Sequence, residues 1–252
     1  MPEPTAEHKK HIRHFTFGDI IRGNLAPNPE AMPEQLAVPA KFLGDILQGI
    51  KDSYLDEEVL GEKGGDNLER QQFILRLAHQ VVRSPIFVGD EHSVGTEKAI
   101  RIWNILYAVF KGKLGLQGIV DWHLHPDASR TWIPSETDIL NWSVNKNAKI
   151  RAIGFRDLIA LFVETEKSMH IGGVDVQTLD YDNKEALTLK IQERLTEQHY
   201  CSRIDASART QVRRDLVALR WLGFEVYLYM LPLTEGIQTL PDTLTFERAK
   251  MP

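Results

Sequence analysis

Two histidines and an aspartate stand at a spacing that suits metal coordination. His123 and His125 are separated by one residue at the end of the apolar stretch 118–124, which has the pattern of a strand. Because side chains alternate across a strand, the two imidazoles should point to the same face. A proline ends the strand, and Ser135 follows as a predicted helix N-cap, which places Asp138 in the first helical turn.

This set of side chains predicts a catalytic rather than a structural metal site. Two imidazoles and one carboxylate leave the fourth tetrahedral position of a zinc ion open. A zinc ion held by His123, His125 and Asp138 would lower the pKa of water to about 7 and so supply a nucleophile at neutral pH. The simpler alternative is a pair of surface histidines beside an ordinary helix cap. We favour the metal site because the strand, H-x-H-P, S-x-x-D and helix occur together and in order.

At these residues the sequence resembles the JAMM zinc metalloproteases, also called JAB or MPN-plus proteins, and in particular their prokaryotic members with a tryptophan before the first histidine. The family pattern is a distant glutamate, then H-x-H-P, a short loop and S-x-x-D. The matching positions are His123, His125, Ser135 and Asp138, with Trp122 and Pro126 also in place. Nine residues separate His125 from Ser135, so the loop is longer than is usual in the family.

The resemblance implies an α/β fold of the α+β type, with a mixed central β-sheet flanked by helices. Such a fold would be JAB/MPN-like, and so cytidine-deaminase-like, here with a helical C-terminal extension. The resemblance further implies zinc as the cofactor and the Ser135 hydroxyl as a hydrogen-bond donor to the developing oxyanion. The implied substrate is the peptide or isopeptide bond at the C-terminal tail of a ubiquitin-like protein.

The general base is implied by the resemblance to be Glu58, in a segment that matches the family's Glu-x-x-Gly after its first helix. In the family an apolar strand follows that glutamate, whereas residues 62–66 here are polar or glycine. Glu91 is the competing candidate, because it lies in a loop after a predicted strand, where catalytic groups often lie.

The loop before Ser135 carries Trp132. Loops beside a rigid site commonly set specificity, so we expect Trp132 to form part of the substrate groove. The alternative is that the ring only anchors the loop to the body of the protein, because an exposed tryptophan needs a packing partner.

Two other classes of function stay open. A catalytically silent MPN-type scaffold would bind partners through its helical extensions, but such scaffolds usually lack one ligand and the set here is intact. A site of the PHP or amidohydrolase type also uses H-x-H. It would need further histidines downstream, where only His170 and His199 remain. We therefore rank the zinc-dependent peptidase first.

Charge and composition limit the kinds of partner and compartment that we expect for this protein. The formal net charge of −5 over 252 residues gives no basic surface for nucleic acid or an anionic membrane. The single cysteine, Cys201, cannot form an internal disulfide, which agrees with a reducing compartment. No signal-peptide pattern or membrane-spanning apolar run is present. We expect a cytoplasmic protein; its oligomeric state is left open.

The chain order predicts an N-terminal extension (1–36), a JAMM/MPN-like domain (37–183) and a C-terminal helical extension with a final strand (184–252). Within these, apolar spacing predicts a helix from residue 38 to about 54. The apolar run 224–231 predicts a strand at the edge of the sheet.

Overall fold

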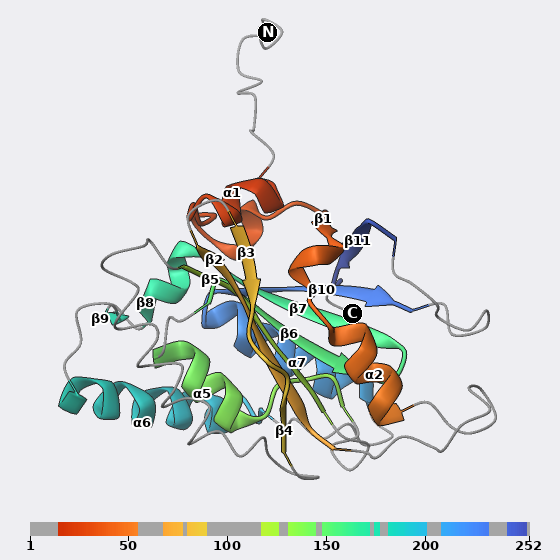
Figure 1. The fold of residues 1–252 in the computed structure, drawn as a ribbon. Coiled ribbons are helices and arrows are strands. Elements are labelled where there is room, and N and C mark those ends of the chain that lie inside the picture. Colours follow the sequence, from red (N-terminus) through yellow and green to blue (C-terminus); the bar gives the residue numbers. More distant parts are fainter. Residues whose placement is uncertain are drawn as a thin grey trace, which may run out of the picture.

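The computed structural model describes residues 15–54, 68–77, 80–89, 117–125, 131–144, 148–171, 174–176, 181–200, 208–231 and 241–250. Its centre is a curled, mixed β-sheet with strand order β1-β11-β10-β7-β6-β5-β2-β3, with β4 paired to β2 (Figure 1). The predicted fold class, a mixed β-sheet flanked by helices, is confirmed.

The strands of this sheet are β1 (Gln35–Pro39), β2 (Arg70–Leu77), β3 (Gln80–Arg83), β4 (Phe87–Val88), β5 (Gln117–Leu124), β6 (Ile150–Phe155), β7 (Leu158–Glu164), β10 (Phe224–Met230) and β11 (Thr243–Arg248). A separate pair consists of β8 (His170–Ile171) and β9 (Val174–Asp175). The helices are α1 (Phe17–Ile21), α2 (Ile46–Tyr54), α5 (Glu136–Val144), α6 (Tyr181–Glu197) and α7 (Ala208–Trp221), with short 3-10 turns η1 (Pro29–Ala31), η2 (Ala40–Phe42) and η4 (Glu166–Met169).

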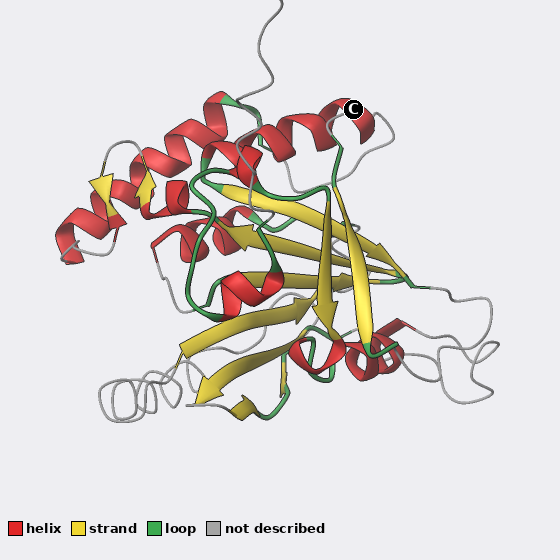
Figure 2. Ribbon diagram, turned by 90° about the horizontal axis from the view of Figure 1, so that it is seen from above, coloured by secondary structure: helices red, strands yellow, loops and turns green. Residues whose placement is uncertain are grey.

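Helices cover both faces of the sheet (Figure 2). One face packs on α1 and α2 through a core that includes Trp122 and Leu124. The opposite face packs on α5, α6 and α7 through a second core that includes Phe162 and Phe224. Alternation along β5 sends Trp122 and Leu124 to the first core and leaves His123 for the second face. The strand next to it, β6, runs parallel to β5, so the chain must cross over between them, and α5 lies in that crossover.

The predicted helix from residue 38 is wrong over its first part. Residues 35–39 form β1, which pairs antiparallel with β11 and alternates exposed and buried side chains. Helical structure resumes as η2, and α2 begins only at Ile46, after Gly44 adopts a left-handed φ of 58°. A side chain at Gly44 would collide with Gln72, so the break before α2 is fixed by close packing.

The predicted strand at 224–231 forms, but not at the edge. β10 lies between β7 and β11 and is buried along most of its length. A strand covered on both faces carries apolar side chains on both, which is why the sequence of β10 does not alternate, although it includes the buried Glu225. The residues after it supply β11, which contacts β1 from the other end of the chain. The predicted boundaries at 36/37 and 183/184 fall inside β1 and inside α6. None of the described helices has the length and hydropathy needed to cross a membrane.

Candidate metal centre

His123 of β5 and His125, which directly follows the strand, point their ring nitrogens at each other. His123 Nε2 and His125 Nε2 lie 3.0 Å apart, and the side chains are only 5% and 6% exposed. His125 continues the extended backbone of β5, because its N–H donates to the Gly154 carbonyl, and the two rings lie on one face as predicted. The His123 ring also lies near Trp142 of α5, with ring centroids 6.1 Å apart.

A backbone carbonyl fixes the tautomer of His125. His125 Nδ1 lies 2.9 Å from the Thr131 carbonyl oxygen, which can only accept a hydrogen bond. In a neutral imidazole the proton must then sit on Nδ1, and the lone pair on Nε2 faces the site. This contact is the usual way in which a metal-ligating histidine is oriented.

The third side chain is held by a helix cap. Ser135 N and Ser135 Oγ both donate to Asp138 Oδ2, at 2.8 and 2.7 Å, and Asp138 N donates back to Ser135 Oγ at 3.1 Å. The predicted N-cap of α5 is thereby confirmed as a reciprocal capping box with aspartate in place of glutamate. The same oxygen, Oδ2, is the carboxylate atom that faces the histidines.

The spacing of the three donors fits a small tetrahedral cation. Asp138 Oδ2 lies 3.7 Å from His123 Nε2 and 3.6 Å from His125 Nε2, while the two nitrogens are 3.0 Å apart. Ligand bonds of about 2.0–2.1 Å place tetrahedral ligand atoms about 3.3 Å apart. The observed separations bracket that value, and these three residues form the one metal-ligating group found among the described residues. They can therefore hold a metal ion; the geometry alone does not select zinc.

The charges in the site depend on one another. Burial acts to lower the pKa of the His123 imidazole, but the carboxylates of Asp138, Glu69 and Asp121 outweigh it and the pKa rises to about 9. Burial likewise acts to raise the pKa of Asp138, but the two imidazoles hold it well below its usual range. Without a metal, the site therefore stabilises a protonated His123 beside an ionised Asp138.

A row of polar side chains continues from the site across neighbouring strands. Gln71 of β2 donates to Asp121 Oδ1 at 2.9 Å, and Asp121 Oδ2 lies 4.0 Å from Arg151 Nε on β6. Arg151 Nη2 lies 3.9 Å from Glu164 Oε1 on β7. Burial raises the pKa of the Asp121 carboxyl, against the opposing effect of the Arg151 charge. A buried positive charge thus lies between two carboxylates on the histidine face of the sheet.

A further carboxylate, that of Glu69, lies within electrostatic reach of the ligands. Gln71 of β2 pairs with His123, so Glu69, two residues earlier, projects to the same face and comes opposite His125. The Glu69 carbonyl accepts a hydrogen bond from Gly89 N, which extends the β2–β4 pairing to this residue. Its carboxylate contributes to the raised pKa of His123, so it lies within electrostatic reach of the site. It does not belong to the ligand group itself.

The other predicted residues are placed as follows. Glu58 and Glu91 lie outside the described residues, as do residues 126–130 of the loop before Thr131. Trp132 is half-buried and its ring lies 6.5 Å from that of Phe162 at 30°, against the second core. Its ring therefore has a packing partner within the protein.

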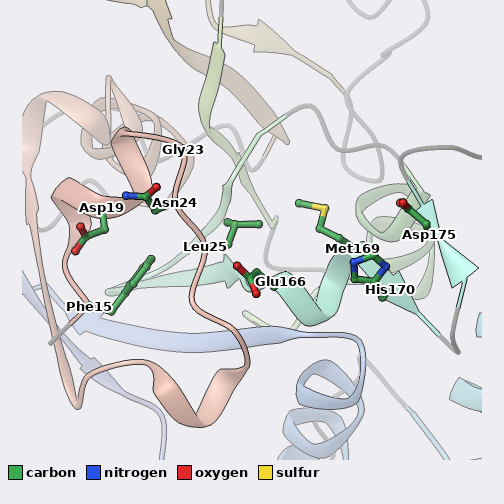
Figure 3. Close-up of a pocket in the computed structure, with 9 residues that line it drawn as sticks. All are labelled: Phe15, Asp19, Gly23, Asn24, Leu25, Glu166, Met169, His170 and Asp175. Carbon is green, nitrogen blue, oxygen red and sulfur yellow. The ribbon is translucent and has the colours of Figure 1, made fainter. Parts of the chain in front are cut away.

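The structure also contains a pocket of about 730 Å³ elsewhere (Figure 3). In Figure 3 one wall comes from the N-terminal segment, with Asp19 and Asn24, and the other from η4 and the β8–β9 pair, with Glu166 and His170. None of the three ligands lines this pocket. The metal-ligand group is thus separate from it.

No protein-family model, no curated protein and no solved structure matches this chain.

Proposed function

We propose that this protein is a zinc-dependent hydrolase that cleaves a peptide or isopeptide bond at the C-terminal tail of a ubiquitin-like protein. The observation that carries the proposal is the convergence of His123, His125 and Asp138, and it is supported by the carboxylate of Glu69 within electrostatic reach of His123. The proposal includes a JAB/MPN-like fold and membership of the JAMM family, which rest on the H-x-H-P and S-x-x-D pattern. A cytoplasmic location stays a prediction from the sequence.

A bound zinc ion would supply Lewis acidity and make water acidic enough to act as a nucleophile near pH 7. The protein would supply the proton transfers. Glu69 would accept the proton of the attacking water at its carboxylate and deliver it to the leaving amine. This role suits a carboxylate that lies near the ligands without being one of them. Glu58, implied by the family resemblance, and Glu91 are the alternatives for the same role.

Ser135 would have two roles. Its backbone N–H and its hydroxyl orient Asp138, as the capping hydrogen bonds indicate. If the hydroxyl rotates away from Asp138 when substrate binds, it would donate to the oxygen that gains negative charge as the carbonyl becomes tetrahedral. The Ser135 N–H bond keeps the carboxylate in place during that rotation. The substrate tail would enter as an extended strand, which is the common mode by which such tails bind at a sheet edge.

The test uses the full chain and a ubiquitin-like protein carrying a C-terminal amide-linked fluorophore. Zinc-loaded protein should release the fluorophore, and chelation or His125→Ala should abolish release. Glu69→Gln should retain zinc and lose turnover. The wild-type chain could instead bind zinc but release fluorophore from neither ubiquitin nor prokaryotic ubiquitin-like probes. That result would contradict the hydrolase and favour a catalytically silent scaffold.

A further inference from the structure

We propose that Tyr200, in the C-terminal extension, is a positioning residue for the ligand Asp138 and acts through the peptide bond between Pro134 and Ser135. The inference rests on the metal site of the proposed function, but not on the reaction proposed for it.

The contact consists of two hydrogen bonds that share one peptide unit. Tyr200 Oη donates to the Pro134 carbonyl oxygen at 2.6 Å. The N–H on the other side of the same peptide bond, that of Ser135, donates to Asp138 Oδ2 at 2.8 Å. In a trans peptide the carbonyl and the N–H point in opposite directions, so the two bonds form a line from the tyrosine to the ligand oxygen.

A hydrogen bond to the carbonyl has two effects on that ligand. It polarises the peptide, which strengthens the N–H as a donor, since hydrogen bonds in a chain reinforce one another. It also fixes the plane of the peptide and with it the direction of the Ser135 N–H. The oxygen that receives this bond lies 3.6 and 3.7 Å from the two histidine nitrogens. Tyr200 therefore acts on the orientation of a ligand that it does not touch.

The end of α6 aims the tyrosine at this peptide. His199 takes a left-handed conformation, with φ of 55°, and its N–H donates to the Thr196 carbonyl. Tyr200 N donates to the Leu195 carbonyl at 2.9 Å, which completes a Schellman motif. A non-glycine residue in this conformation costs on the order of 1 kcal/mol, which the surrounding contacts must offset. The chain reversal packs the partly buried Tyr200 ring against the second core.

A further bond ties this turn to the next helix. Gln211 of α7 donates through Nε2 to the His199 carbonyl oxygen at 2.9 Å. Three hydrogen bonds thus connect α7 to Asp138: from Gln211 to the His199 carbonyl, from Tyr200 to the Pro134 carbonyl, and from Ser135 N to the carboxylate. The two helices of the C-terminal extension are in this way linked to the metal ligand.

The decisive variant is Tyr200→Phe, because it removes the hydroxyl and keeps the ring. The structure supplies a matched control: Tyr227 Oη also donates to a proline carbonyl, that of Pro33, at 2.6 Å, but from the opposite face of the sheet. Cobalt(II) and zinc affinities and the visible cobalt spectrum should be measured for both variants, together with urea stability. Changes to partners outside the ligand set typically lower metal affinity about 10- to 100-fold.

We expect Tyr200→Phe to bind cobalt about tenfold or more weakly, with an altered ligand-field spectrum, while Tyr227→Phe keeps both properties of the wild type. Equal metal affinity and spectrum in wild type and Tyr200→Phe would overturn the inference, even if stability fell. If Tyr200→Phe does not fold, Gln211→Ala decides: weaker cobalt binding supports the inference and unchanged binding overturns it.

The inference and the proposed function can fail separately. Weaker metal binding in Tyr200→Phe with no hydrolysis by the wild type would support the positioning role and contradict the peptidase. Hydrolysis by the wild type with unchanged metal binding in Tyr200→Phe would support the peptidase and contradict the positioning role. A wild-type chain that binds no metal would overturn both.

Discussion

Ser135 and Asp138 hold each other at the first turn of α5, with Asp138 Oδ2 accepting from both the N–H and the hydroxyl of Ser135. The aspartate side chain is therefore oriented by a helix cap before any metal arrives. A ligand fixed in this way loses little conformational entropy when a metal binds, which favours affinity.

Replacing Ser135 by alanine removes the two hydrogen bonds of its hydroxyl, the one donated to Asp138 Oδ2 and the one accepted from Asp138 N. We expect Ser135→Ala to lose about 1 kcal/mol of unfolding free energy, the usual cost of an N-cap. Metal affinity should fall about 10- to 100-fold because the carboxylate is less well oriented. Urea unfolding and zinc titration measure the two effects. Ser135→Thr, which keeps the hydroxyl, is the control and should remain close to the wild type; an alanine variant with wild-type affinity and stability would contradict the described cap.

Glu69→Gln should retain metal and lose turnover. A neutral amide of the same shape cannot accept the proton of water, and removing a general base costs about 10²–10⁴-fold in rate. The measurements are kcat on the fluorogenic substrate and zinc content of the same sample. Glu58→Gln and Glu91→Gln are the matched variants. Full activity in Glu69→Gln together with loss of activity in one of them would move the base to that residue.

The stability of the metal-free protein should fall as pH rises from 6.5 to about 9. The pKa of His123 is raised from 6.5 to about 9 in the folded protein. A raised folded-state pKa contributes stability that is fully present below about pH 6.5 and lost as pH rises through about 9. Urea unfolding in the presence of a chelator, at several pH values across this range, measures the effect.

Bound zinc should reverse that dependence. A metal competes with the proton for Nε2 of the histidine, so zinc affinity, and the stability that zinc confers, should rise over the same pH range. His123→Gln is the control and should remove most of the pH dependence in both states. Identical pH profiles with and without zinc would contradict the assignment of His123 as a ligand.

Trp132→Ala tests the two roles considered for the loop. The half-buried ring packs against Phe162, which favours the anchoring role. We therefore expect a lower melting temperature, with zinc content and KM unchanged. A groove role would instead raise KM, because a hot-spot tryptophan contributes about 2 kcal/mol or more to binding. A wild-type melting temperature with a raised KM would thus contradict the anchoring role and restore the expectation drawn from the sequence.

Local rules were sufficient for the ligands. The shared face of His123 and His125 follows from strand alternation, and the position of Asp138 follows from the capping box that Ser135 begins. The two residues of each pair lie within four positions of each other, so a local sequence pattern is enough to predict their relative placement.

Glu69 could not be placed in that way, because its position near the site depends on how β2 pairs with β5 across the 39 residues between the two strands. One signal is present in the sequence: residues 62–66, which follow the segment of Glu58, are polar or glycine, whereas a strand follows Glu69 directly. The pairing of β1 with β11 was missed for the same reason, since it joins opposite ends of the chain. The contact of Tyr200 with Pro134 depends on the packing of α6 on α5, which no local pattern indicates.

The central claim is that His123, His125 and Asp138 hold a metal ion, and the most direct test is the metal content of the full chain. Elemental analysis of protein purified without added metal, followed by zinc titration, should give about one zinc ion per chain in the wild type and none in His125→Ala. Asp138→Asn, which keeps the size of the side chain, should bind zinc far more weakly. Less than about a tenth of an ion per wild-type chain, with none taken up on titration, would contradict the account.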